Sequence, residues 1–185
     1  MILRLGLLFA IFSTAAQAAV VFRPAKAGDK RAIEVLVNDP EVIAYFAGGR
    51  PYNSAQFYLS LSSFRQEGGN FVIAERKTGR MVGSGYFSAK TIEENESHQW
   101  EVAYAILPKE RRKGYARQAL RKMMAMIYRK DPIATVTARV SGLNEASQEL
   151  LESEGFVPEE IIDRSKNPKR AVRYIYSKKC EDSVL

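Results

Sequence analysis

The sequence of 185 residues contains one cysteine and one histidine. A single cysteine, Cys180, excludes an intrachain disulfide and any metal cluster built on cysteine pairs. Structural and catalytic zinc sites combine several imidazole or thiolate ligands, which this chain does not have. We therefore expect no metal cofactor. We interpret His98, in the polar stretch 93–99, as a solvated loop residue, with a contact to a substrate as the alternative.

Acidic residues are fewer than basic ones. The chain has 21 aspartate and glutamate residues against 28 lysine and arginine residues, so its formal net charge is +7. Nucleic acid, an acidic membrane surface and a phosphorylated cofactor would all suit this charge. The basic residues cluster at 109–122 and 164–179, but the sequence contains no long basic tail, zinc finger or RNP signature. The charge therefore suits an anionic partner, and we expect no nucleic acid.

An apolar run, Leu5–Phe12, stands near the amino terminus and is too short to form a stable membrane span. Ala16-Gln17-Ala18 follows it and fits the pattern that precedes a signal-peptidase cut. An N-terminal hydrophobic helix and a start codon assigned too early are the alternatives. The length fits one domain. The predicted organisation is a signal-like or disordered leader at 1–18, a domain at 19–179 and a tail at 180–185.

The rest of the chain alternates strand-like and helix-like segments. We expect strands at 19–23, 71–76, 81–88, 99–106, 133–140, 159–163 and 172–177. We expect main helices at 28–38, 54–66, 115–129 and 144–153, and a short helix at 42–46. This mixture predicts an α/β fold in which four main helices flank a mixed central sheet of about seven strands.

A basic glycine loop, Arg111-Arg112-Lys113-Gly114-Tyr115-Ala116, joins the expected strand at 99–106 to the expected helix at 115–129. Unsatisfied backbone N–H groups and the helix dipole make a helix N-terminus attractive to anions. Gly114 permits a positive φ or a close backbone approach to a ligand. The loop therefore suits a phosphate, although the loop alone is equally compatible with a basic turn before an ordinary helix.

Two motifs resemble those of the GCN5-related N-acetyltransferase (GNAT) superfamily. The loop matches the family's acetyl-CoA signature, Arg/Gln-x-x-Gly-x-Gly/Ala. One strand later, Asn144-x-x-Ser147-x-x-Leu150 matches a second family motif, and the order of elements is similar over about 19–179. The Asn-x-x-Ser form and an early Asp39-Pro40-Glu41-Val42 resemble the ribosomal-protein alanine N-acetyltransferase branch. The resemblance implies a mostly antiparallel sheet, splayed between its fourth and fifth strands.

The resemblance also implies acetyl-CoA as cosubstrate. Backbone N–H groups of the basic loop would hold its pyrophosphate, and cations of the loop and the following helix would contact its phosphates. The pantetheine arm would lie in the splay, bonded to the fourth strand and to the motif asparagine. The implied cofactor-binding residues are Ile106, Leu107, Arg111, Arg112, Lys113, Gly114, Tyr115, Ala116, Arg117, Asn144 and Ser147.

Catalysis in such a protein is direct attack of a neutral amine on the thioester. Glu101 is the candidate general base, and an ion pair or simple exposure is the alternative interpretation. Many family members place a tyrosine acid seven residues after the motif asparagine, but Leu151 stands there. Ser147 is then the candidate for polarising the leaving thiolate. Tyr104 and Tyr115 are weaker candidates, and departure of the thiolate without an acid is a further alternative.

We therefore predict an acetyl-CoA-dependent N-acetyltransferase that acts on the primary amine of a protein N-terminus, a peptide or a small molecule. The alternative is a catalytically silent acyl-CoA-binding regulatory module on the same fold. The cofactor requirement predicts the cytoplasm, while the signal-like segment leaves export open. Either a monomer or a homodimer is compatible with the sequence.

Overall fold

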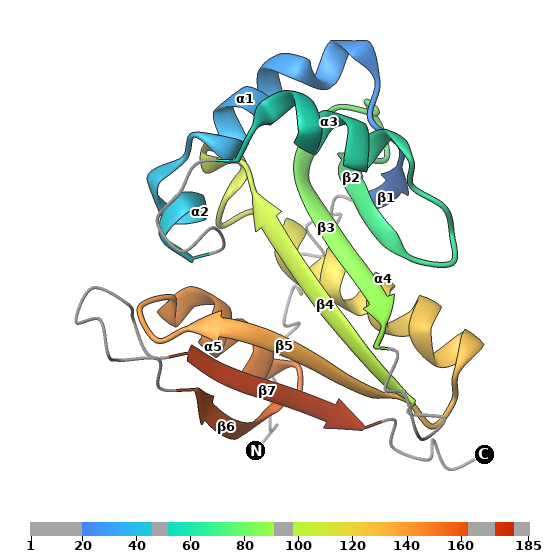
Figure 1. The fold of residues 1–185 in the computed structure, drawn as a ribbon, viewed down its shortest axis with the longest axis vertical. Helices are drawn as coiled ribbons and strands as arrows, with labels where there is room; N and C mark the ends of the chain where they lie inside the picture. The colour runs from blue at the N-terminus through green and yellow to red at the C-terminus, as the bar shows by residue number, and fades with distance from the viewer. Residues whose placement is uncertain (1–19, 46–51, 91–97, 163–172, 180–185) are drawn as a thin grey trace, which may run out of the picture.

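The computed structural model of the chain describes residues 20–45, 52–90, 98–162 and 173–179 (Figure 1). The predicted leader at 1–18 and the predicted tail at 180–185 lie outside these ranges. No helix within these ranges is long and apolar enough to cross a membrane.

Seven strands form one mixed sheet, which confirms the predicted α/β architecture. The strands are β1 (Val20–Arg23), β2 (Gly69–Glu75), β3 (Met81–Ala89), β4 (Gln99–Ile106), β5 (Thr135–Ser141), β6 (Val157–Ile162) and β7 (Arg173–Lys179). Their order across the sheet is β1-β2-β3-β4-β5-β7-β6 (Figure 1). Strands β4 and β5 run parallel, and every other neighbouring pair is antiparallel.

Strands β4 and β5 pair only over their first three residues. The register runs from Gln99 opposite Thr135 to Glu101 opposite Thr137. Beyond that point β4 continues to Ile106 without a strand partner on its β5 side. The two strands therefore diverge, and the predicted splay between the fourth and fifth strands is confirmed.

Helices cover both faces of the sheet in the described ranges. They are α1 (Lys30–Val37), α2 (Pro40–Tyr45), α3 (Ser54–Ser62), α4 (Tyr115–Lys130) and α5 (Glu145–Ser153), with 3₁₀ turns at Ala27–Asp29 and Pro108–Glu110. Helices α1 and α3 pack on one face through a core cluster that includes Leu36 and Leu61. Helix α4 packs on the opposite face (Figure 1).

Helix α4 shows why the sequence folds this way. Apolar side chains recur every three or four residues along it, so they form one stripe facing the sheet. Leu120, Met123 and Ile127 are fully buried in the core cluster, as their spacing predicts. They lie in one cluster with Phe71 of β2 and Trp100 of β4, which packs α4 against the sheet.

Several element boundaries differ by a few residues from the sequence prediction, and those of α3 and β5 have a visible cause. Helix α3 ends at Ser62 rather than near residue 66, because the Gly68 N–H bonds to the Arg65 carbonyl at 3.2 Å in a tight turn. Strand β5 begins at Thr135, after a turn in which the Ala134 N–H bonds to the Asp131 carbonyl at 3.1 Å.

The Asp131 carboxylate also explains where His98 lies. One carboxylate oxygen accepts the indole N–H of Trp100 at 3.0 Å, and the other lies 2.7 Å from His98 Nδ1. The imidazole is partly exposed and lies at the start of β4. His98 therefore belongs to the turn that sets the register of β4 and β5.

Candidate active site

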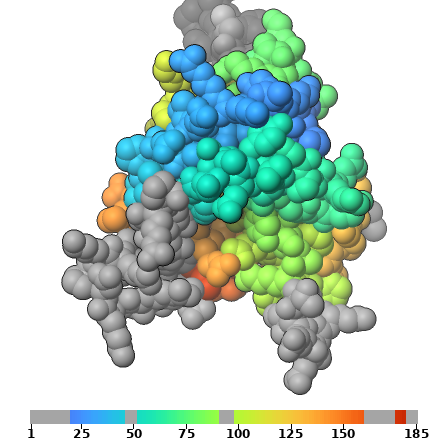
Figure 2. Space-filling view, turned by 45° about the horizontal axis from the view of Figure 1, so that its top comes forward, coloured from blue at the N-terminus to red at the C-terminus, as the bar shows by residue number. Residues whose placement is uncertain are grey.

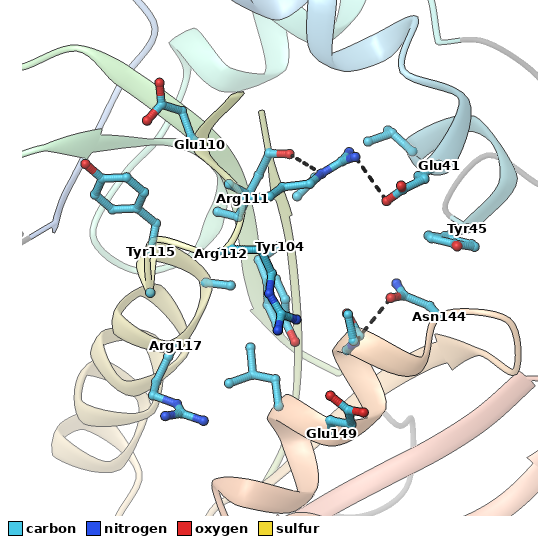
Figure 3. A pocket seen from close by; sticks show the side chains of 18 of the residues that line it. Glu41, Tyr45, Tyr104, Glu110, Arg111, Arg112, Tyr115, Arg117, Asn144 and Glu149 are labelled. Atoms are coloured by element: carbon cyan, nitrogen blue, oxygen red, sulfur yellow. Dashed lines mark hydrogen bonds and ion pairs between the residues drawn. The ribbon is translucent and has the colours of Figure 1, made fainter. Parts of the chain in front are cut away.

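A cavity of about 630 Å³ lies where β4 and β5 diverge (Figure 3). Its walls come from α2, the end of β4, the basic loop, the first turn of α4, and α5. Most of the predicted cofactor-binding residues meet here. Those that line the cavity are Ile106, Arg111, Arg112, Gly114, Tyr115, Ala116, Arg117, Asn144 and Ser147.

The basic loop turns through two left-handed residues. Arg112 has φ 63° and Gly114 has φ 79°, the latter at the N-cap position of α4. Glycine adopts this conformation without a steric cost, which explains its presence at the cap. No side chain caps α4. Its first backbone N–H groups and the positive end of its dipole therefore remain available to an anion in the cavity.

Arg111 holds the loop against α2. One guanidinium nitrogen lies 2.6 Å from Asp39 Oδ1. Another lies 3.0 Å from Glu41 Oε2, while Nε donates to the Ile106 carbonyl (Figure 3). Asp39 Oδ1 also accepts the backbone N–H of Val42 at 3.1 Å. Two carboxylates thus neutralise Arg111, so its charge positions the loop rather than meeting a phosphate.

The other predicted cations differ in how they are paired. Lys113 Nζ lies 3.1 Å from Glu110, and Arg117 Nε lies 3.1 Å from Glu154. Arg112 is exposed, lines the cavity and has no ion-pair partner within the described part of the chain. Arg112 is therefore the cation of the loop whose charge is uncompensated.

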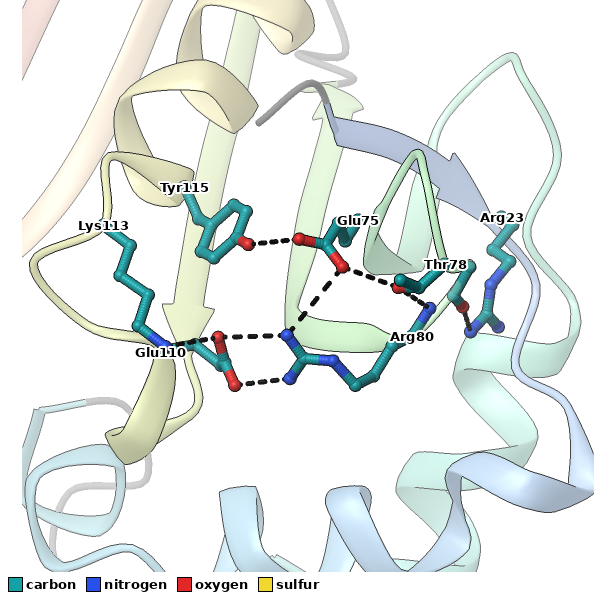
Figure 4. A network of polar contacts seen from close by, with 8 residues as sticks. Arg23, Glu75, Thr78, Arg80, Glu110, Lys113 and Tyr115 are labelled. Carbon is teal, nitrogen blue, oxygen red and sulfur yellow. Dashed lines mark hydrogen bonds and ion pairs between the residues drawn. The ribbon is translucent and has the colours of Figure 1, made fainter. Parts of the chain in front are cut away.

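A polar network holds the loop from its other side (Figure 4). The Tyr115 hydroxyl donates to Glu75 at 2.9 Å, and Thr78 donates to the same carboxylate at 2.6 Å. Arg80, next to this turn between β2 and β3, pairs with Glu110. The Arg80 hydrogen bond holds the pKa of Glu110 below its usual range, although burial opposes this. The network fixes the loop to the β2–β3 turn.

Asn144 and Ser147 form the opposite wall of the cavity. Asn144 Oδ1 accepts the backbone N–H of Ser147 at 3.2 Å and so caps α5 (Figure 3). This leaves the Asn144 amide Nδ2, which meets no acceptor within the described ranges. Because the cap fixes the amide oxygen of Asn144, its Nδ2 can donate a hydrogen bond to a carbonyl group in the cavity.

Tyr104 lies between these walls. Its hydroxyl oxygen is inaccessible to solvent and meets no hydrogen-bond partner among the described residues, although the ring is partly exposed. Burial raises the pKa of Tyr104 to about 12, and the neighbouring Ser147 side chain acts in the opposite direction. The sequence does not indicate that the Tyr104 hydroxyl is buried, because a tyrosine in a strand can equally well have a packing role with its hydroxyl in solvent.

Three predicted site residues lie outside the cavity lining. Lys113 points to Glu110, as described above. Leu107 is buried, its N–H bonds to the Val82 carbonyl at 2.9 Å, and its carbonyl accepts the Glu110 N–H at 2.8 Å. Glu101 is held by Arg139. The structure therefore does not bring the candidate base together with Ser147 in this cavity.

A second cavity of about 210 Å³ adjoins the first on the face of the sheet covered by α1 and α3. In the space-filling view, part of β3 comes to the surface below α3 on this face (Figure 2). The two cavities share three lining residues, Val42, Tyr104 and Ala105. Among the described residues, the rest of the second lining is apolar, aromatic or neutral polar, without a charged side chain.

The fold is an α/β fold in which a mixed sheet splays beside a helix N-terminus that no described side chain caps. The chain belongs to the GNAT acetyltransferase family, because the model of the acetyltransferase (GNAT) domain matches residues 19–157. No curated protein matches the sequence significantly.

Solved structures share the fold at low sequence identity. A GNAT-family acetyltransferase from Bacillus anthracis is 20% identical with a TM-score of 0.73, and the match covers 89% of this chain and 96% of that chain. YncA from Salmonella typhimurium, solved with its cofactor acetyl-CoA, is 17% identical (TM-score 0.67; 90% and 97% covered). Spermidine N-acetyltransferase from Vibrio cholerae, in complex with CoA and spermine, is 20% identical (TM-score 0.68; 89% and 96% covered).

Proposed function

We propose that the protein is an acetyl-CoA-dependent N-acetyltransferase that acetylates a primary amine by direct attack on the thioester. The observation that carries this proposal is the uncapped N-terminus of α4, which meets the cavity of the splay beside the unpaired Arg112. Coenzyme A has a pyrophosphate and a 3′-phosphate, the groups that such a helix end and cation bind. The family membership of the chain supports the same cosubstrate.

We assign each part of acetyl-CoA to a different set of described residues. We assign the pyrophosphate to backbone N–H groups of the loop and the first turn of α4, with Arg112 as the phosphate cation. The pantetheine arm would add to the unpartnered edge of β4 beyond Glu101, as a peptide adds to a sheet edge. Asn144 Nδ2 would donate to a carbonyl of that arm. Ser147, further along the same wall, would meet the thioester end.

The second cavity is our candidate for the acceptor. It meets the first at Val42, Tyr104 and Ala105, so an amine seated in it would reach the thioester end of the cofactor. Phe57 and other apolar or aromatic side chains line it, and no carboxylate does within the part of the chain that the structure describes. Such a lining suits an amine beside a small apolar group, as at a protein N-terminus. This is consistent with an alanine N-acetyltransferase-like branch, and it does not suit a polyamine, whose several cations need carboxylates.

Glu101 remains the candidate base, acting through water. The register of β3 and β4 sets Glu101 opposite Ser88 and Ala105 opposite Ser84, so Glu101 and Ala105 share one face of the sheet. Ser84 and Ala105 line the second cavity. The carboxylate therefore lies on the acceptor face, although beyond the lining of the cavity.

Thermal unfolding with acetyl-CoA tests the cofactor. Wild-type protein should gain stability with acetyl-CoA according to mass action, by about 2.7 kcal/mol at a hundred times Kd. Gly114→Glu should lose this gain, because it places an anion at the phosphate site. Gly114→Ala also places a Cβ at this left-handed backbone position but adds no anion, so it serves as the matched control. The absence of a shift with acetyl-CoA or CoA in the wild type would overturn the proposal.

A catalytically silent acyl-CoA-binding module is the second candidate. The observation in its favour is Glu101, whose carboxylate is occupied by Arg139 and lies outside both cavities. An amine-panel assay that follows CoA release separates the two. Stabilisation by acetyl-CoA without CoA release for peptides, monoamines or polyamines would establish the silent module.

A further inference from the structure

The Tyr104 hydroxyl is the most unusual polar group near the cavity. A buried hydroxyl normally has a hydrogen-bond partner, since its hydration is lost on folding. Tyr104 Oη has none among the described residues, yet the residue lines both cavities. A packing role alone does not explain the oxygen, because phenylalanine would fill the same space without this cost.

Ser147 is the polar side chain beside this hydroxyl. It lines the first cavity and stands in the first turn of α5, where the Asn144 cap fixes its backbone N–H at 3.2 Å. Its side chain acts on the pKa of Tyr104 as a hydrogen-bonding neighbour and lowers it against the effect of burial, so the two hydroxyls lie side by side. One rotatable bond carries the Ser147 hydroxyl, so Ser147 can face the cavity while Tyr104 lies behind it.

We propose that Tyr104 and Ser147 form a hydroxyl pair, in which Tyr104 donates a hydrogen bond to Ser147 Oγ and Ser147 donates to the sulfur of the thioester. This inference rests on the proposed function. Hydroxyl chains polarise one another, so the first donor strengthens the second. Tyr104 is the positioning residue, because it acts through Ser147, and Ser147 touches the reacting group.

The transfer step balances without consuming either hydroxyl. The amine nitrogen attacks the thioester carbonyl carbon, the C–S bond breaks, and its electron pair leaves on sulfur. Ser147 stabilises the negative sulfur by a hydrogen bond. The proton lost by the amine passes to water or a base, and the thiolate takes a proton from water after release. Burial keeps Tyr104 protonated, which suits a permanent donor better than an acid that must release its proton.

The removal of one oxygen atom tests the pair. Tyr104→Phe should lower kcat roughly tenfold, the scale of one hydrogen bond, with KM for acetyl-CoA changed less than twofold. The Tm of the protein without acetyl-CoA should change little, because phenylalanine fills the same buried space. A tyrosine kept for structural reasons would give the opposite pattern, a lower Tm with normal kcat. Tyr58→Phe is the control, because Tyr58 lies on α3 and lines neither cavity.

A double-mutant cycle then tests whether Tyr104 acts through Ser147. Ser147→Ala alone should lower kcat by roughly 10²-fold, as the loss of a donor to developing charge does. Adding Tyr104→Phe to Ser147→Ala should cause no further loss. An active wild type with unchanged kcat in Tyr104→Phe, or with losses that multiply in the double variant, would overturn the hydroxyl pair alone. A wild type that neither binds acetyl-CoA nor releases CoA would overturn the proposed function as well.

Discussion

Arg139 holds Glu101 through two parallel hydrogen bonds, with Nε 2.8 Å from Oε1 and Nη2 2.7 Å from Oε2. Glu101 is the last residue of β4 that pairs with β5, and Arg139 lies on β5 just beyond the last paired position, Thr137. The ion pair therefore lies where the two strands begin to diverge. The pair closes that end of the splay. Arg139 also binds both oxygens of the carboxylate that the family resemblance offers as a general base.

Two variants separate these roles of Glu101. Both Glu101→Gln and Arg139→Gln break the ion pair, and each should cost at most about 1 kcal/mol of stability because the pair is partly exposed. If Glu101 is the general base, it also accepts the proton of the attacking amine. Glu101→Gln should then lower turnover by roughly 10²-fold or more. Arg139→Gln should retain most of the activity. Steady-state CoA release at saturating acetyl-CoA measures both, and equal losses in the two variants would leave Glu101 with the structural role only.

The cations of the basic loop should differ in their effect on acetyl-CoA binding. Arg112 has no internal ion-pair partner among the described residues, whereas Lys113 is held by Glu110. Arg112→Gln should therefore weaken acetyl-CoA binding by roughly tenfold, as expected for a charge-assisted hydrogen bond of about 1.5 kcal/mol. Lys113→Gln should change binding less than threefold.

Calorimetric titration at low and high salt measures this difference. Added salt should reduce the affinity of the wild type more than that of Arg112→Gln, because exposed charges are screened. Equal affinities in the two variants would remove Arg112 as the phosphate cation and redirect attention to the backbone N–H groups alone.

The network behind the loop should make stability depend on acidity. The hydrogen bond from Arg80, assisted by Lys113, holds the pKa of Glu110 below its ordinary value of 4.5, and burial opposes this. On acidification the unfolded chain takes up the Glu110 proton first, at about pH 4.5. The contribution of this carboxylate is therefore complete above that pH and is lost as the pH falls through the lower, folded pKa.

Glu110→Gln tests this contribution. The variant should be less stable at pH 7 by about 1 kcal/mol, since one partner of the ion pair is half-exposed. It should also lose less stability than the wild type between pH 5 and pH 3. Urea unfolding at several pH values measures both effects. Parallel stability curves for the two proteins would show that Glu110 does not contribute to the acid sensitivity.

The sequence predicted the helices and strands around the site better than the ion pairs of its charged residues. The periodicity of α4 and Gly114 at its start are local signals, so this helix and its first residues could be predicted, whereas the splay was expected only through the family resemblance. The neutralisation of Arg111 by Asp39 joins residues 72 positions apart, and the Glu101–Arg139 pair spans 38. Pairings of this kind depend on how strands and helices pack, and no local pattern reports them. For the same reason, the three cations of the loop looked equivalent in the sequence, although among the described residues Arg111 and Lys113 have carboxylate partners and Arg112 has none.

The second cavity, our proposed acceptor site, gives a prediction about substrate choice. The described part of its lining contains apolar, aromatic and neutral polar groups, including Asn70 of β2, and no carboxylate. The wild type should therefore acetylate a monoamine or a peptide N-terminus with higher kcat/KM than spermidine.

Asn70→Asp changes the lining by one charge at almost constant shape. A nearby carboxylate attracts a second cationic centre by up to about 1 kcal/mol at a solvated site, so the spermidine-to-monoamine ratio of kcat/KM should rise about fivefold. Asn70→Leu, which removes the polar group without adding charge, is the control. A wild type that prefers spermidine, or a ratio that Asn70→Asp leaves unchanged, would show that the acceptor does not occupy this cavity.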